Sequence, residues 1–127
     1  MSVSIVASAK TNPRNPAAPI IYYPTAVKNG EVDLDELAEE ISASTSLTPA
    51  DCYGVILALV HSVSGQLEKG NIVRLGHLGS LQVSVRGEGA PTPEGVTPAL
   101  VKKAALTFRP GKKLKQMLQE LKYVKKR

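Results

Sequence analysis

The side chains that could support catalysis are few and scattered along the chain. It holds two histidines, His61 and His77, and a single cysteine, Cys52. His61 has no acidic residue at helical contact distance, and Cys52 follows Asp51, a neighbour that does not favour a reactive thiolate. These residues do not form an ordinary zinc site, and no nucleophile elbow, phosphate loop or dinucleotide fingerprint occurs. We therefore expect no catalytic residue, metal, cofactor or small-molecule substrate, and we do not expect an enzyme.

Two glycines, Gly76 and Gly79, lie three residues apart in the stretch IVRLGHLGSLQVSV. A Gly-x-x-Gly loop can clamp the backbone of single-stranded RNA, but in that kind of site it joins two helices. Here both flanking segments alternate as strands do, which favours a tight corner of a sheet. The RNA clamp stays an alternative that requires helices on both sides of the glycines.

A basic segment near the C-terminus could bind phosphates. Between Lys112 and Arg127 there are seven basic residues against Glu120 alone, whereas Glu31 to Asp51 holds seven acidic residues and no basic one. The first lysines of the basic segment lie at the start of a predicted helix, where they oppose the helix dipole. With a net charge of +5, this sorting of charge indicates a basic face suited to nucleic acid or another anionic partner.

Composition bounds the remaining possibilities. A length of 127 residues fits one domain, and an aromatic content of only 4% favours a dimer that pools two small cores. No apolar run approaches the roughly 20 residues that a membrane span needs, and the start MSVSIVASAK does not resemble a signal peptide. We therefore expect a cytoplasmic protein that does not associate with a membrane.

The first 30 residues are predicted to form two strands and a connecting loop. SVSIVASA alternates with strand spacing, and TNPRNPAAP, with three prolines and two asparagines, is typical of a loop. Pro24 confines the following segment, IIYYPTAV, to a sheet edge or a bulge.

Helices and further strands are predicted after this segment. One helix follows its expected cap, Asp33, and a second begins at Thr48 and Pro49 and ends at Gly70. The second helix is apolar on more than one side, so we expect it to pack against both its own sheet and a partner chain. Strands are expected in NIVRL, SLQVSV and ALVKKAALTF, with a long turn in EGAPTPEGVTP and a last helix over residues 112–124. The predicted fold class is α+β.

Three local sequences, in this order and spacing, resemble the bacterial HU and integration-host-factor family of histone-like DNA-binding proteins. The helix pair over residues 32–71 is similar to that family's helical hairpin, RLGHLGSLQV to its hairpin corner, and FRPGKKLK to the start of its last helix. The resemblance covers about residues 31–122. The N-terminal NPRNPAAPIIYY is similar to an extension found in a Bacteroides-type variant of the family.

The resemblance implies an intertwined homodimer with a helical base, an antiparallel sheet, a C-terminal helix and two extended β-ribbon arms. In that family the arms wrap double-stranded DNA in the minor groove, and a tip proline wedges into a base step. We accordingly expect residues 1–30 to form an extension, residues 31–127 to form an HU-like DNA-binding domain, and the arm to cover about residues 82–107.

Some DNA-contacting residues follow from position in the family pattern. Arg86, Lys112 and Lys115 match basic residues of the family, and the tip proline is Pro91 or Pro93. The full set expected to contact DNA is Arg86, Lys102, Lys103, Arg109, Lys112, Lys113 and Lys115. The implied function is architectural, non-sequence-specific DNA binding and condensation in the nucleoid.

The predicted arm tip departs from the family pattern. GAPTPEGVTP replaces the family's tip, and Glu88 and Glu94 bring negative charge to a place where phosphates are expected. An alternative is therefore an HU-like fold that serves as a protein-interaction or structural module, with weak or no DNA binding. The apolar IIYY stretch could then add to the sheet edge of another chain.

Overall fold

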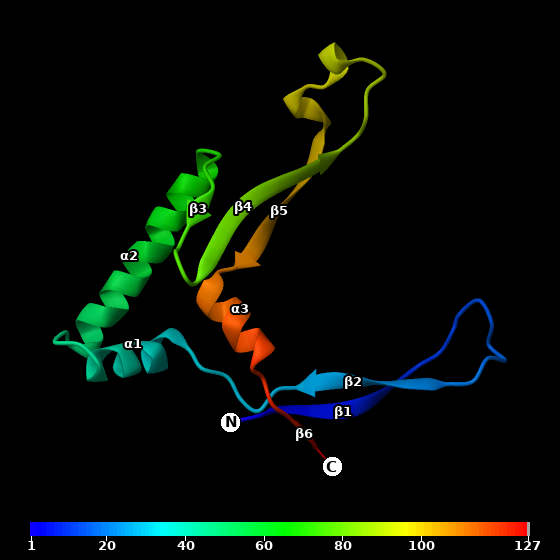
Figure 1. Ribbon diagram of the computed structural model, residues 1–127. Helices are drawn as coiled ribbons and strands as arrows, with labels where there is room; N and C mark the ends of the chain where they lie inside the picture. Colours follow the sequence, from blue (N-terminus) through cyan, green and yellow to red (C-terminus); the bar gives the residue numbers. More distant parts are fainter. Residues whose placement is uncertain (127) are drawn as a thin grey trace. The chain divides into compact units, whose positions relative to one another are not determined.

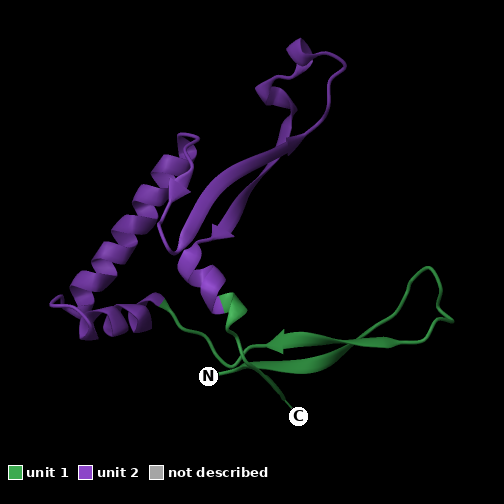
Figure 2. Ribbon diagram, in the orientation of Figure 1, with its two compact units in different colours: residues 1–33, 118–127 green, residues 34–117 purple. Residues whose placement is uncertain are grey.

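The computed structural model describes residues 1–126 of the chain, so Arg127, the last residue of the predicted DNA-binding domain, lies outside the described residues. The described chain is a mixed α+β structure with three α-helices and two three-stranded sheets, which confirms the predicted class. It divides into two units (Figure 2): unit 1 comprises residues 1–33 and 118–127, and unit 2 comprises residues 34–117. The predicted domain boundary after residue 30 stays a prediction.

Unit 2 begins with a helix pair, α1 (Leu34–Ala43) and α2 (Pro49–Glu68). The Thr48 hydroxyl accepts a hydrogen bond of 3.1 Å from the backbone N–H of Asp51, and Pro49 follows it, as predicted for the start of α2. At the other end Gly70 has φ +84°, a conformation that favours glycine and stops the helix.

The sheet of unit 2 has the order β3-β4-β5, and all its strands are antiparallel. The strands are β3 (Val73–Arg74), β4 (Gly79–Gly87) and β5 (Val101–Pro110). β4 and β5 pair along their whole length to form the β4–β5 ribbon, and two short 3-10 turns, η1 (Pro93–Gly95) and η2 (Pro98–Leu100), lie in the connection (Figure 1). The strands and the turn-rich connection match the sequence prediction.

Gly76 and Gly79 form a sheet corner. Both have positive φ, +60° and +148°, and the segment between them joins β3 to β4. The backbone N–H of Leu75 donates to the carbonyl of Gly79 at 2.7 Å, which closes the turn. Strands therefore flank the glycines, so the predicted corner is confirmed and the RNA clamp is excluded.

The same corner holds the start of the last helix, α3 (Lys112–Gln119), in unit 2. The N–H of Gly111 donates to the carbonyl of Leu78 at 3.0 Å. A β-carbon at residue 111 would lie 2.5 Å from the carbonyl oxygen of His77 and 2.6 Å from that of Gly76. Only glycine allows this approach of two backbones, which fixes where the basic residues of α3 begin.

Gly111→Ala is therefore expected to destabilise the protein by about 1–3 kcal/mol, the usual cost of overpacking. The matched control is Gly89→Ala in the β4–β5 connection, where a β-carbon meets no atom within 4 Å. Urea unfolding of both variants at one chain concentration measures the difference. Equal midpoints for the two variants would contradict the steric role of Gly111.

Unit 1 is built on a sheet of order β2-β1-β6. β1 (Val3–Lys10) and β2 (Ile21–Val27) form an antiparallel hairpin, the β1–β2 ribbon, and both strands were predicted. β2 lies at the edge of the sheet, as its Pro24 requires. β6 (Tyr123–Lys125) pairs with β1 in parallel.

The prediction that the last helix continues to residue 124 is wrong. α3 ends at Gln119, and the chain then runs beside β1. The N–H of Val3 donates to the carbonyl of Lys122, and the N–H of Lys126 donates to the carbonyl of Ile5, each at 2.8 Å. The aromatic and β-branched pair Tyr123 and Val124 suits a strand, and the open edge of β1 supplies the partner that local sequence cannot specify.

Candidate nucleic-acid interface

Three of the predicted cations meet at one level of the β4–β5 ribbon. Arg86 lies directly opposite Lys103, so their side chains share a face of the sheet. The next pair is Gly87 with Val101, which leaves Lys102 as the extra residue of a β-bulge. A bulge redirects side chains and increases twist. The structure thus brings Arg86, Lys102 and Lys103 together, and we call them the ribbon cations.

Gly87 makes this arrangement possible. A β-carbon at this position would overlap the carbonyl group of Leu100. The N–H of the following residue, Glu88, donates to the same carbonyl at 3.1 Å, which closes the ribbon just beyond the bulge. The glycine therefore lets the strands approach where the cations gather.

The other four predicted cations lie at the base of the ribbon and on α3. Arg109 lies opposite Ser80 near the end of β5, and α3 begins two residues after Pro110. Lys112 and Lys115 are three residues apart and share one side of the helix. The base cations are all exposed: Arg109, Lys112, Lys113 and Lys115. Arg109 lies six positions after Lys103 along β5, a spacing of roughly 20 Å.

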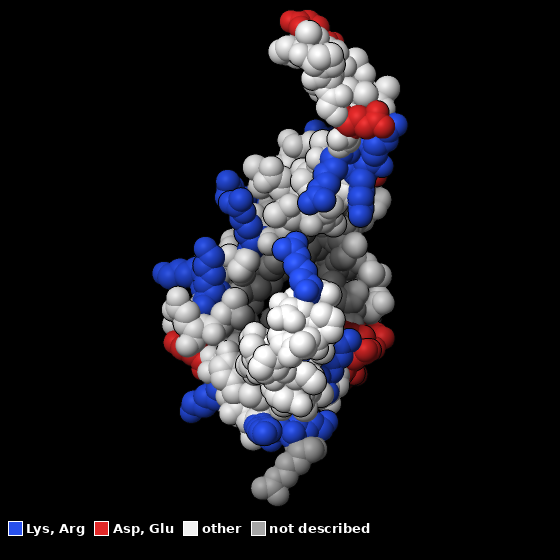
Figure 3. Space-filling model, turned by 90° about the vertical axis from the view of Figure 1, so that its right-hand side faces the viewer, with Lys and Arg blue, Asp and Glu red and all other residues white. Residues whose placement is uncertain are grey.

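The tip of the β4–β5 ribbon has a different character. Pro91 lies in the connecting segment and Pro93 begins η1, and both are exposed. Glu88 and Glu94 are exposed in the same connection. Figure 3 shows red acidic surface at the free end of this ribbon and blue basic side chains gathered along the ribbon below it. The positive charges of the ribbon therefore lie on strands β4 and β5, and the negative charges lie in the connection at its tip.

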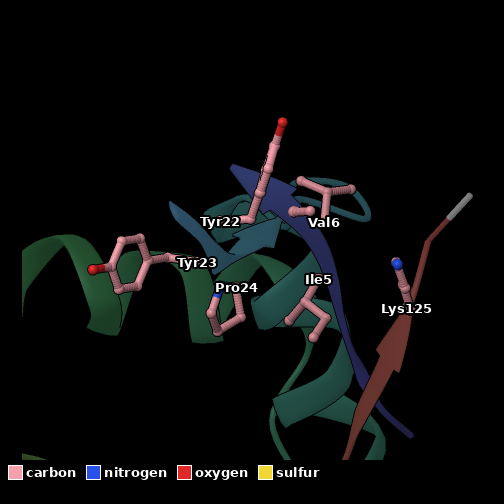
Figure 4. A pocket seen from close by; sticks show the side chains of 7 residues that line it. Ile5, Val6, Tyr22, Tyr23, Pro24 and Lys125 are labelled. Carbon is pink, nitrogen blue, oxygen red and sulfur yellow. The ribbon is translucent and has the colours of Figure 1, made fainter. Parts of the chain in front are cut away.

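Sequence reasoning assigned no site residue to unit 1, yet this unit carries exposed basic and aromatic side chains. A shallow pocket of about 210 Å³ lies there, lined by Ile5, Val6, Ala7, Tyr22, Tyr23, Pro24 and Lys125 (Figure 4). Tyr22 and Tyr23 point in different directions from β2, as neighbouring residues of a strand do. The signal that could have directed attention here is the absence of any acidic residue between Met1 and Gly30.

The groups that could support catalysis remain apart. Cys52 is a free cysteine whose side chain is buried, at 2% exposed. In residues 1–126 no group of three or more His, Cys, Asp or Glu side chains could hold a metal ion. No helix in that range is long and apolar enough to cross a membrane.

The chain matches a known protein family over nearly its whole length. A model of the HU-HIG family, described as an HU domain fused to a wHTH, Ig or glycine-rich motif, matches residues 1–126. The chain belongs to the HU-HIG family. The HU-like resemblance seen in the sequence is thereby confirmed, and the HU-HIG match includes the β1–β2 ribbon as well as the helices and the β4–β5 ribbon.

A solved structure shares the fold of this HU-HIG chain. It is a candidate bacterial DNA-binding protein from Bacteroides vulgatus ATCC 8482, with a TM-score of 0.67 and 12% sequence identity. The similarity covers 99% of this chain and 50% of that one, so this chain spans about half the length of its structural relative. No curated protein matches the chain.

Proposed function

We propose that this HU-HIG chain binds double-stranded DNA as a homodimer, without sequence specificity, and acts as an architectural protein of the nucleoid. The ribbon cations and the base cations contact phosphates. The proposal includes a cytoplasmic location and no enzymatic activity. The observation that carries it is the gathering of Arg86, Lys102 and Lys103 at one level of an exposed β-ribbon in an HU domain.

The charge arrangement supports phosphate contacts rather than base reading. Lysine and arginine on an exposed ribbon neutralise the DNA backbone, and such contacts position a protein without conveying sequence. The base cations extend the same surface toward α3. The similarity to a candidate DNA-binding protein from Bacteroides agrees with this proposal.

The small number of buried apolar side chains among residues 1–126 supports the homodimer. In that range the buried apolar side chains are those of Ala38 and Cys52, one from each helix of the α1–α2 pair. On α2 the side chains of Val55, Leu59 and Val60 are 61%, 46% and 56% exposed. Exposed apolar surface on this scale is typical of an interface.

Surface area supports the same conclusion. The chain exposes 10850 Å², whereas a compact protein of 13.5 kDa exposes roughly 6500 Å². Two separate compact units of half that mass would together expose roughly 7900 Å². The division into two units therefore does not account for the excess. The exposed β-ribbons and the exposed apolar side chains of α2 contribute to it, and the apolar side chains support a second copy.

The test is a titration of full-length protein against a random-sequence duplex at several salt concentrations, followed by fluorescence anisotropy. If the ribbon cations each neutralise one phosphate, log K falls with log salt with a slope of about −0.9 per contact. We expect a slope of at least about −2.7, with little difference between unrelated sequences. A folded dimer that binds no duplex at low salt would refute the proposal in favour of an interaction or structural module.

A further inference from the structure

A second ribbon in the chain has the charge that the β4–β5 tip lacks. The β1–β2 ribbon pairs over seven positions, from Ser4 with Val27 to Lys10 with Ile21, and residues 11–20 form its tip. Residues 1–30 hold three cations, Lys10, Arg14 and Lys28, and no acidic residue. The ribbon therefore has cations at its tip and its base and no negative charge that would repel a polyanion.

The tip of this ribbon is ordered by its own turns. The N–H of Asn15 donates to the carbonyl of Asn12 at 3.1 Å, and the N–H of Ala18 donates to the carbonyl of Asn15 at 3.0 Å. Pro13 and Pro16 each follow the asparagine that begins a turn, where the fixed φ of proline favours that turn. The side-chain Oδ1 of Asn12 also accepts from the N–H of Arg14 at 3.0 Å.

These turns present one arginine between two prolines. Arg14, Pro13 and Pro16 are all exposed, and the backbone that carries them is held before any ligand binds. A tip that is already ordered loses less conformational entropy on binding than a free loop does. Figure 1 shows this tip as a loop beyond the ends of β1 and β2.

Basic and aromatic groups continue down the ribbon from the tip. The Lys10 ammonium lies 5.5 Å from the centre of the Tyr23 ring, a single cation–π contact between β1 and β2. On the other side of the sheet Lys125 lies opposite Ile5 and lines the pocket with Tyr22 (Figure 4). No carboxylate lies in either strand to repel phosphates.

The residue types at the tip select the ligand. Proteins that enter the minor groove use arginine and asparagine to read its floor and apolar side chains such as proline to part base steps. Narrow, A·T-rich minor grooves attract arginine in particular. The β4–β5 tip, with Glu88 and Glu94, has the opposite charge and no cation between Gly87 and Val101.

We propose that the β1–β2 ribbon is a second DNA-binding element, in which Arg14 enters the minor groove of A·T-rich duplex between Pro13 and Pro16. This inference rests on the proposed DNA binding of the chain. It makes the extension a contributor to affinity and to A·T preference, while the ribbon cations of β4–β5 supply phosphate contacts that are indifferent to sequence.

The test compares Arg14→Ala with Lys28→Ala in the full-length protein. Each substitution removes one positive charge from the same unit, but Lys28 follows β2 at the base of the ribbon, roughly 24 Å of strand from the tip. Affinities for an A-tract duplex and a G·C-rich duplex of equal length are measured by fluorescence anisotropy. Circular dichroism checks the fold, which Arg14→Ala should keep because the hydrogen bond from residue 14 to Asn12 is donated by the backbone N–H.

The wild-type protein is expected to prefer the A-tract duplex, and Arg14→Ala is expected to abolish that preference and weaken A-tract binding roughly eightfold, at 0.1 M salt, for each β1–β2 ribbon that engages DNA. Lys28→Ala is expected to keep the preference. Netropsin, which occupies A·T minor grooves, is expected to compete with the wild type and not with Arg14→Ala.

Two results would overturn the inference while leaving the proposed function intact. One is an equal loss of DNA affinity in Arg14→Ala and Lys28→Ala with an unchanged A·T preference. This result would mean that Arg14 contributes only a general electrostatic attraction. The other is wild-type binding by Arg14→Ala together with lost binding when the ribbon cations are removed. Failure of the wild type to bind any duplex would instead refute the proposed function, and this inference with it.

Discussion

Replacing Arg86, Lys102 and Lys103 together by alanine is expected to cause a large loss of DNA affinity. Each phosphate contact contributes about 0.9 log units of affinity at 0.1 M salt relative to 1 M salt. Three contacts correspond to about 2.7 log units, or roughly a 500-fold weaker binding for each ribbon that engages DNA. The salt slope should become less steep by about 2.7.

The physical reason for this size is the position of the three residues. Arg86 and Lys103 are direct cross-strand partners, and the bulge adds Lys102 at the same level, so the variant removes a continuous cluster. All three side chains are exposed, and none of them lies in the small buried core, so stability should change little. Surface substitutions of this kind usually alter stability by less than about 0.5 kcal/mol.

The control is Lys69→Ala. Lys69 is an exposed cation of unit 2 at the end of α2, outside the ribbon and α3. Salt-dependent anisotropy on one random duplex should give near wild-type affinity for the control. A triple variant that keeps both the affinity and the salt slope of the wild type would remove the ribbon from the DNA interface.

Elements with strong local signals were predictable from the sequence. The start of α2 follows from Thr48 and Pro49, whose capping chemistry is local, and the corner follows from Gly76 and Gly79, which tolerate positive φ. In each case the deciding interaction joins residues only a few positions apart. Interactions between residues so close in sequence can be predicted without knowing how the rest of the chain folds.

β6 could not be placed from sequence because its partner is distant in the chain. Leu114, Met117 and Leu118 continue a helical pattern toward the C-terminus, so the periodicity favours a longer helix than the structure has. Parallel pairing with β1 decides the outcome, and that pairing joins residues 3–5 to residues 123–125. Tertiary contacts overrode local propensity here.

The candidate site shows the same division. The ribbon cations were predicted as residues, but their meeting at one level depends on a register shift between Arg86 and Gly87, which no local pattern encodes. The tip around Arg14 was predicted only as a loop, because the hydrogen bonds that order Asn12 and Asn15 are visible only in the folded hairpin. The sequence identified the charged residues of the ribbon, but their positions relative to one another depend on the register of β4 and β5.

Val55→Asp is expected to dissociate the proposed homodimer. Val55 is the most exposed of the large apolar side chains of α2, at 61%, so an aspartate there would meet solvent and cost little if the protein worked as a single chain. In a dimer that covers this face, the substitution buries an unpaired carboxylate in each copy. Each such burial costs on the order of 3 kcal/mol or more, which corresponds to at least a roughly 150-fold weaker association.

Light scattering after size-exclusion chromatography measures the outcome directly. The wild type should have twice the 13.5 kDa mass of one chain, and Val55→Asp should shift to the monomer mass at micromolar concentration. The control is Val96→Asp, at a residue 64% exposed in the β4–β5 connection, which should remain dimeric. Because a single chain buries little more than Ala38 and Cys52, the Val55 variant should also lose its cooperative thermal unfolding and its affinity for DNA. A monomeric wild type that still unfolds cooperatively would contradict the dimer and leave the exposed face of α2 for a different partner.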